Sequence, residues 1–188
     1  RILSHNGGGI EGEEAVELMN DLIADPRFAA LAAAIGFSIH VTPTFRHTGV
    51  IDAAHEPDRA KMRFTEPHNV LEQAIAQHLP HMTRQTEDAA ARKMCRDIHA
   101  LMLTSYEILK EHPVNLKRIA NGQLPANMIW PWGAATAVRL PDFKEAFGHH
   151  GSVISAVPLV WGIANLAGLK TPKVEGANGD LDTNYEGK

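Results

Sequence analysis

Arg46 and His47 are adjacent residues whose side chains could together bind an anion. A guanidinium group grips a phosphate or carboxylate through two parallel hydrogen bonds, which the ammonium group of a lysine cannot do. The pair follows a predicted hairpin turn and begins a strand that continues through Val50 and Ile51. Taken alone, an Arg-His pair is more often a solvated surface feature than a binding site, so these two residues need partners from elsewhere in the chain.

Eleven histidines raise the question of a metal site. His78 and His81 lie three residues apart, and His149 and His150 are adjacent. Neither pair is accompanied by carboxylates or cysteines at the spacing of metal ligands. Exposed loop histidines are the better interpretation, and we expect no metal site in this chain.

Two further features invite a chemical role. The run from Gly7 to Gly9 precedes a predicted helix, where backbone N–H groups could bind a phosphate. It lacks the Gly-Lys-Ser/Thr of a P-loop, so a turn is the better interpretation. The single cysteine, Cys95, lies beside Met94 on a predicted helix, and we expect a buried, unreactive thiol.

The elements that must position these residues follow from hydrophobic periodicity and from proline and glycine. The first part of the chain predicts a hairpin and several helices, of which the longest ends at His112-Pro113. The expected helices are 13–24, 28–35, 70–78 and 86–111, the hairpin strands are 37–42 and 45–52, and 55–63 is a loop.

The pattern changes near residue 125, where short strands and helices alternate. Strands at 127–130, 152–157 and 171–175 would flank helices at 141–147 and 159–167. This order predicts parallel βαβ packing. We therefore expect two domains, residues 1–124 and residues 125–188, in an α/β fold.

Bulk composition excludes several classes of protein. The 188 residues are 44% hydrophobic, enough for a core, and the net charge of -4 favours neither nucleic acid nor an anionic membrane as a partner. A single cysteine suits the reducing cytoplasm. The chain has no initiator methionine and ends abruptly at Lys188, so we expect it to be an internal piece of a longer protein.

Several short motifs, in this order, resemble those of one family. They are Phe45-Arg46-His47, Pro67-His68, His112-Pro-Val-Asn115, Pro125-Ala-Asn127, Trp132-Gly133, Val153-Ile-Ser-Ala-Val157 and Leu181-Asp-Thr-Asn-Tyr-Glu-Gly-Lys188. The chain resembles the archaeal-type, 2,3-bisphosphoglycerate-independent phosphoglycerate mutases of the alkaline phosphatase superfamily, whose bacterial members include proposed homoserine kinases.

The resemblance implies an enzyme with a divided architecture. Residues 1–124 would form most of an inserted α/β domain that caps the substrate, and residues 125–188 would return into a metal-binding core. A serine of that core would carry the phosphoryl group between the 3- and 2-positions of phosphoglycerate, assisted by two divalent metal ions (manganese, magnesium or zinc). The serine and the metal ligands would lie outside these residues, so we expect the piece alone to bind no metal and to be inactive.

The resemblance also implies substrate-binding residues and a partner. The partner would be a small phosphorylated metabolite, and unpaired strand edges in the second part predict self-association of the piece. The implied residues are Arg1, Arg46, His47 and His68 at the phosphate or the cleft; Asn115, Arg118 and Asn127, which either position the cleft edge or brace the hinge; and Thr183, Asn184 and Lys188 on the core side.

Departures from the family pattern leave two alternatives. Ala134-Ala135-Thr136 stands where the family has Gln-Gly-Lys/Arg, Pro158 and Trp161 replace an Asp and a Lys, and Asn69 replaces an Asp. The first alternative is a related phosphotransferase or hydrolase that acts on another small phosphorylated or phosphonate compound. The second is a non-catalytic α/β binding module.

Overall fold

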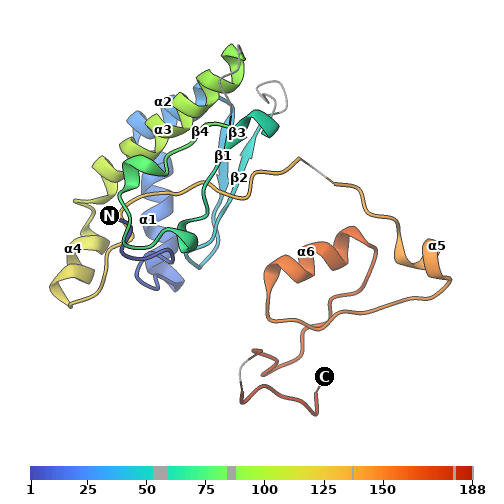
Figure 1. Cartoon of the computed structure of the whole chain (residues 1–188). Helices are drawn as coiled ribbons and strands as arrows, with labels where there is room; N and C mark the ends of the chain where they lie inside the picture. Colours follow the sequence, from blue (N-terminus) through green and yellow to red (C-terminus); the bar gives the residue numbers. More distant parts are fainter. Residues whose placement is uncertain (53–58, 84–87, 137, 180, 188) are drawn as a thin grey trace. The chain divides into compact units, whose positions relative to one another are not determined.

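The computed structural model describes residues 1–52, 59–83, 88–136, 138–179 and 181–187. The chain divides into two compact units, Arg1–Ala135 and Thr136–Lys188 (Figure 1). The sequence predicted a boundary after Leu124, and the division lies after Ala135 because residues 126–130 pack on the core of the first unit. The assignment of the two parts to a cap and a core stays a prediction.

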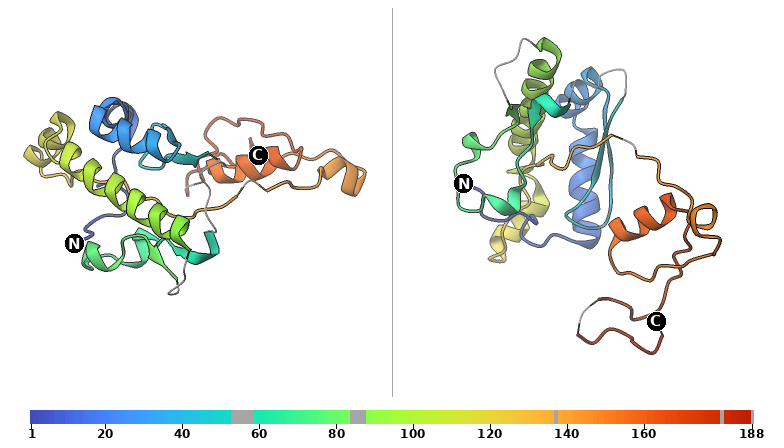
Figure 2. Two further views of the ribbon diagram at one scale, coloured as in Figure 1. Left: turned by 90° about the horizontal axis from the view of Figure 1, so that it is seen from above. Right: turned by 45° about the vertical axis from the view of Figure 1, so that its right-hand side comes forward.

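Helices α1 (Gly12–Ala24), α2 (Pro26–Ala34) and α3 (Ala89–Leu109) lie side by side in the first unit, and Figure 2 shows them from two further directions. Apolar residues three and four positions apart give α1 and α3 one buried face each, which confirms both predicted helices. The core includes Leu18 and Leu22 of α1, Phe28 of α2, and Ile98, Leu101 and Met102 of α3.

The predicted hairpin is confirmed, with shorter strands. Strands β1 (Phe37–His40) and β2 (Thr48–Ile51) pair antiparallel, with Phe37 opposite Ile51 and His40 opposite Thr48. The ring of Phe37 covers Gly49, where a Cβ would come within 2.7 Å of the ring. The loop between the strands carries Arg46 and His47.

The segment after the hairpin is less helical than predicted. It contains the 3₁₀ turns η2 (Arg59–Lys61), η3 (Pro67–Asn69) and η4 (Ile75–Gln77), and the short antiparallel strands β3 (Met62–Arg63) and β4 (His81–Met82). The predicted helix at 70–78 is therefore wrong, because Glu72 adopts a positive φ of 64° that interrupts it. Residues 55–58 of the predicted loop lie outside the described residues.

Around residues 112–130, the predicted end of the long helix is confirmed, and the predicted strand is wrong. His112-Pro113 ends α3 and immediately starts α4 (Pro113–Ala120), because proline is suited to the first position of a helix and the His112 ring accepts a hydrogen bond from the N–H of Val114. The predicted strand at 127–130 pairs with no described strand. Its backbone is bonded by side chains instead, as described below.

The second unit contains α5 (Phe143–Phe147) and α6 (Pro158–Leu166), which confirms both predicted helices. The strands predicted at 152–157 and 171–175 are absent from the described residues, where Ser152 and Lys170 form one isolated parallel bridge. Parallel strands are stable in larger sheets with covered faces, and one bridge provides neither. Leu159, Ile163 and Leu166 of α6 are exposed, and the predicted self-association stays a prediction.

Candidate anion-binding site

Side chains from four separate stretches of the first unit converge around Arg46. The ring centroid of His5 lies 6.4 Å from that of Phe45 and 6.1 Å from that of His68, and His68 lies 5.4 Å from Trp132. The Arg46 Cζ atom lies 5.2 Å from the centroid of the Phe45 ring and 6.0 Å from that of Trp132. We refer to these five residues as the Arg46 cluster.

Hydrogen bonds to its backbone N–H and carbonyl fix Arg46 in the loop, and its side chain is exposed. The Arg46 N–H donates to the Thr44 hydroxyl at 3.1 Å, and the Thr42 hydroxyl donates to the Arg46 carbonyl. The neighbouring Phe45 packs against the hydrophobic core. The loop thus places the guanidinium where it can stack on two aromatic rings, and such stacking limits its freedom before any ligand arrives.

His47 points into the loop that presents Arg46. Its Nδ1 atom accepts a hydrogen bond from the backbone N–H of Thr42 at 3.2 Å. Burial lowers the pKa of His47, because the charged imidazolium loses hydration. A neutral His47 is the form that can accept this bond, so the ring stabilises the loop; its predicted role toward substrate stays a prediction.

His5 belongs to the turn that leads into the glycine run. The N–H of Gly8 donates to the Ser4 hydroxyl at 2.9 Å, and the N–H of Gly9 donates to the Asn6 carbonyl at 2.9 Å. These N–H groups are used within the turn, which confirms the interpretation of the glycine run as a turn. The close packing of this turn on residues 124–126 explains Gly8, where a Cβ would collide with the Leu124 carbonyl.

Trp132 is brought to His68 by residues 126–132, which we call the anchored segment. Asn115 binds the backbone of Ala126 with both ends of its amide, at 2.8 Å and 3.0 Å. The N–H of Ile129 donates to the Ser105 hydroxyl at 3.0 Å, and the Trp130 indole N–H donates to the Thr65 carbonyl at 2.8 Å. The segment also carries Asn127, a partly buried residue.

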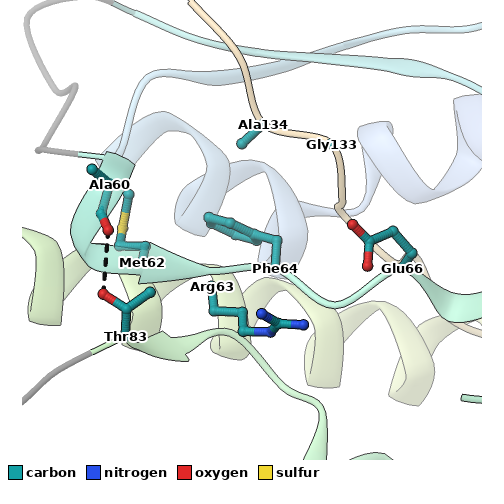
Figure 3. A pocket seen from close by; sticks show the side chains of 8 residues that line it. All are labelled: Ala60, Met62, Arg63, Phe64, Glu66, Thr83, Gly133 and Ala134. Carbon is teal, nitrogen blue, oxygen red and sulfur yellow. Dashed lines mark hydrogen bonds between the residues drawn. The ribbon is translucent and has the colours of Figure 1, made fainter. Parts of the chain in front are cut away.

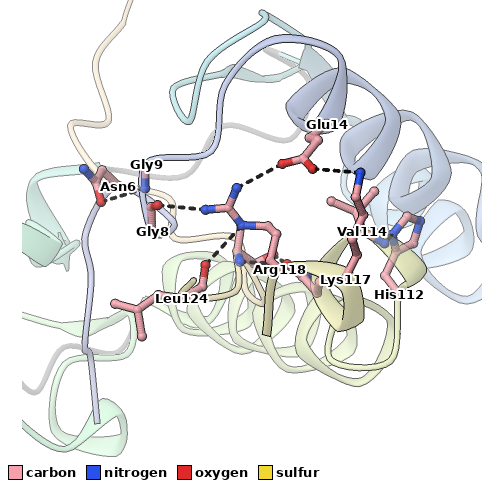
Figure 4. A network of polar contacts seen from close by, with 11 residues as sticks. Asn6, Gly8, Gly9, Glu14, His112, Val114, Lys117, Arg118 and Leu124 are labelled. Atoms are coloured by element: carbon pink, nitrogen blue, oxygen red, sulfur yellow. Dashed lines mark hydrogen bonds and ion pairs between the residues drawn. The ribbon is translucent and has the colours of Figure 1, made fainter. Parts of the chain in front are cut away.

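Arg118 is 3% exposed and joins three parts of the first unit (Figure 4). Its guanidinium donates to the carbonyls of Leu124 and Gly8, at 3.1 Å and 2.7 Å, and to the Glu14 carboxylate at 3.0 Å. These contacts connect the glycine turn to the start of the anchored segment. Of the two roles that the resemblance left open for Arg118 and Asn115, the internal bonds favour bracing.

The remaining predicted residues lie apart from the cluster. Arg1 is exposed beside Ile2, whose backbone bonds to Glu72 and Gln73. In the second unit, the Thr183 hydroxyl accepts from the N–H of Gly179 at 3.3 Å, and the Asn184 amide donates to the Glu175 carbonyl at 2.9 Å. Lys188 lies outside the described residues. The structure therefore brings together Arg46 and His68 from the predicted set.

Sequence reasoning missed His5, Phe45 and Trp132 as members of the cluster. Phe45 and Trp132 stood within the quoted motifs, next to Arg46 and Gly133, and that proximity was the available signal. His5 had none, because it meets His68 only through the folding of the chain.

A hollow of about 330 Å³ lies beside the anchored segment (Figure 3). Gly133 and Ala134 form one wall, and β3 with the residues after it forms the opposite wall. Arg63 and Glu66 contribute opposite charges, and Met62 and Phe64 contribute apolar surface. The hollow adjoins Gly133, the residue that follows Trp132 in the chain.

Metal-binding groups do not gather in the part of the chain that the structure describes. Within it, no set of three His, Cys, Asp or Glu side chains is arranged to hold a metal ion. His78 instead bonds the Gln73 side chain at 2.8 Å, and His81 bonds the Leu79 carbonyl at 3.0 Å. These residues do not fit a metal centre, and the Arg46 cluster is suited to hold an anion rather than to activate one.

Comparison with known proteins identifies the family. The family model of 2,3-bisphosphoglycerate-independent phosphoglycerate mutase matches residues 1–115. The chain is 36% identical over its whole length to such a mutase of Methanosarcina barkeri, and 44% identical over 68% of its length to a probable one of Geobacter sulfurreducens. It spans 42% and 29% of the lengths of these two relatives.

The fold agrees with this comparison. A solved structure from Pyrococcus horikoshii matches 97% of the chain with a TM-score of 0.58 at 18% identity, and the match covers 42% of that protein. At this identity the likeness supports the mixed α/β fold. Because the family model matches more than half of its residues, the chain belongs to the 2,3-bisphosphoglycerate-independent phosphoglycerate mutases.

Proposed function

We propose that the Arg46 cluster binds the phosphate group of phosphoglycerate, as part of an enzyme that interconverts 3-phosphoglycerate and 2-phosphoglycerate. The observation that supports this most is the convergence of Arg46 with His5 and His68 on one exposed face. A guanidinium and two imidazoles can donate several hydrogen bonds to phosphate oxygens. Membership of the mutase family supports phosphoglycerate as the substrate.

The rings around Arg46 make it a better phosphate ligand than a free surface arginine. Phe45 and Trp132 both lie within stacking distance of the guanidinium. A side chain that is already restricted loses less conformational entropy when a ligand binds. Stacking also leaves the edge N–H groups of the guanidinium available for the phosphate.

The chemical step belongs to groups other than the Arg46 cluster in this proposal. A phosphoserine intermediate and two divalent metal ions would require a nucleophile and a set of ligands, and the described residues hold no such ligand set. These residues bind and orient the substrate, and the piece alone is inactive.

Arg46 provides the test, in the complete gene product. We expect Arg46→Ala to lower kcat/KM for 3-phosphoglycerate by about 10- to 150-fold, which corresponds to the loss of about 1.5–3 kcal/mol from charged hydrogen bonds. Arg46→Lys should recover part of the loss, because it restores the charge without the fork. The matched control is Arg96→Ala, which removes an exposed arginine of α3 and should leave kcat/KM unchanged.

Two results would contradict different parts of the proposal. If Arg46→Ala leaves kcat/KM unchanged, Arg46 is not a substrate ligand. If the folded, metal-loaded gene product shows no mutase activity, phosphoglycerate is not the substrate, and a related phosphotransferase or hydrolase becomes the assignment. An effect of Arg46→Ala on another phosphorylated or phosphonate substrate would then retain the phosphate-binding role.

A further inference from the structure

The anchored segment has an unusual way of satisfying its backbone. An extended stretch normally pairs with a neighbouring strand, and backbone groups left without partners in a packed environment are costly. Here Asn115 of α4 takes both backbone groups of Ala126, and Ser105 of α3 takes the N–H of Ile129. Side chains of two helices therefore provide the hydrogen bonds that a neighbouring strand would otherwise provide.

The two polar anchors are fully buried. Asn115 and Ser105 are both 0% exposed. The Asn115 amide also donates to the Leu109 carbonyl at 2.8 Å, and the Ser105 hydroxyl donates to the Met102 carbonyl at 2.7 Å. Ser105 is thus fixed by its own helix, and Asn115 of α4 is fixed by Leu109, the last residue of α3. A buried polar side chain with bonds in fixed directions sets the position of its partner more narrowly than apolar packing does.

A third anchor lies close to the Arg46 cluster. The Trp130 indole N–H donates to the carbonyl of Thr65, which lies three residues before His68. This bond ties the segment to the stretch that carries His68. Trp132 lies two residues after Trp130, and its ring contacts the ring of His68 and the guanidinium of Arg46.

We propose that Asn115, Ser105 and Trp130 are positioning residues that hold Trp132 against His68 and Arg46. Their contacts run from the helices, through the anchored segment, to the cluster. The ring contacts and hydrogen bonds support the arrangement of the cluster by themselves. Only the effect of this arrangement on catalysis rests on the proposed function.

The test measures the environment of His68 directly. In the complete gene product labelled with 13C at histidine Cε1, the His68 signal is assigned by its loss in His68→Gln. The ring current of Trp132 contributes to its chemical shift, and Trp132→Phe measures that contribution. We expect Trp130→Phe, which removes the indole bond to Thr65 and keeps a smaller aromatic ring, and Ser105→Ala to shift the His68 signal in the same direction as Trp132→Phe.

Tyr106→Phe is the matched control, because it removes the hydroxyl of the exposed residue next to Ser105 on α3. It should leave the His68 signal in place. A general loss of stability would lower the unfolding midpoint without moving this native-state signal. If Trp130→Phe and Ser105→Ala both fold and both leave the His68 signal unchanged, the proposal is wrong.

Kinetics provide a separate readout that depends on the proposed function. We expect Trp130→Phe and Ser105→Ala to raise KM for 3-phosphoglycerate by about 2- to 10-fold, which is the worth of one neutral hydrogen bond, with a smaller change in kcat. A moved His68 signal with unchanged KM supports the positioning role and contradicts the placement of substrate at the cluster. An unmoved signal with raised KM contradicts the positioning role alone.

Discussion

The imidazole of His68 meets the indole of Trp132 edge to face, with ring centroids 5.4 Å apart and ring planes at 76°. The two residues lie far apart in the chain, and their contact joins the 3₁₀ turn η3 to the anchored segment. The same indole lies 6.0 Å from the Arg46 Cζ atom. Trp132 therefore contacts both Arg46 and His68, two of the predicted anion ligands, and brings them close together.

Trp132 should contribute to substrate binding through these ring contacts. Its side chain is partly exposed, so we expect Trp132→Ala to raise KM for 3-phosphoglycerate by about 2- to 5-fold, the worth of an exposed cation–π contact. Trp132→Phe should retain most of the affinity because it keeps an aromatic face. Steady-state kinetics of the complete gene product measure both, and an Ala variant with wild-type KM would remove Trp132 from the site.

Arg118 should be important for stability. Arg118→Ala leaves the Gly8 and Leu124 carbonyls and the Glu14 carboxylate without their shared donor. Glu14 is 35% exposed and can be rehydrated in part, so we expect a loss of about 2–4 kcal/mol in the free energy of unfolding.

Lys117 is the matched control for Arg118. It lies 3.8 Å from the same Glu14 carboxylate, but its side chain is 71% exposed. Lys117→Ala should cost less than about 0.5 kcal/mol. Urea unfolding measures both variants, and equal losses would show that burial does not distinguish the two cations.

Gly8 and Gly9 should differ in their tolerance of a methyl group. Both have positive φ, 68° and 74°, so alanine at either position is strained by about 1–2 kcal/mol. A Cβ at Gly9 meets nothing within 4 Å, whereas one at Gly8 collides with the Leu124 backbone. We expect Gly8→Ala to be less stable than Gly9→Ala by about 1 kcal/mol or more. Thermal and urea unfolding of the two variants test this, and equal stabilities would contradict the close approach.

Asp25 should make stability depend on acid pH. Side-chain hydrogen bonds from Arg27 are the largest cause that lowers the pKa of Asp25, from 3.8 to about 2. Because the pKa in the folded state is depressed, the stabilisation is complete above about pH 5 and is lost as pH falls from 4 toward 2. Asp25→Asn should therefore be less stable than the wild type at pH 5, and the difference should shrink by pH 2. A difference that is constant over this range would contradict the assignment.

The local elements of the fold were largely predictable from sequence. Helices α1 and α3 have apolar residues at helical spacing, and the Phe37–Ile51 hairpin alternates between two turn-forming stretches. Each of these patterns is contained in a short stretch of consecutive residues, so it can be recognised without knowledge of distant contacts. The parallel strands predicted for the second unit were wrong because apolar runs there indicated strands without showing what they would pair with.

The candidate site was predictable only in part. Arg46 and His68 could be named from their motifs, but the bonds that assemble their surroundings cross large separations in the chain. Ser105 bonds the backbone of Ile129, 24 residues away, and Arg118 bonds Gly8, 110 residues away. A serine or an arginine within a helix does not indicate, by its type alone, which distant backbone group it will bind. From sequence, the anchored segment therefore resembles an ordinary strand.

The buried hydroxyl of Ser105 and amide of Asn115 also determine the register of the chain that lies on them. The side chains of Met128 and Ile129 pack on the core, but apolar packing opposes a slip of one residue less specifically than hydrogen bonds in fixed directions do. A slip of that size would turn the N–H of Ile129 away from its acceptor and leave the Asn115 amide facing the wrong peptide. The two helices therefore select a single alignment of the segment, the one that places the indole of Trp132 beside His68 and Arg46.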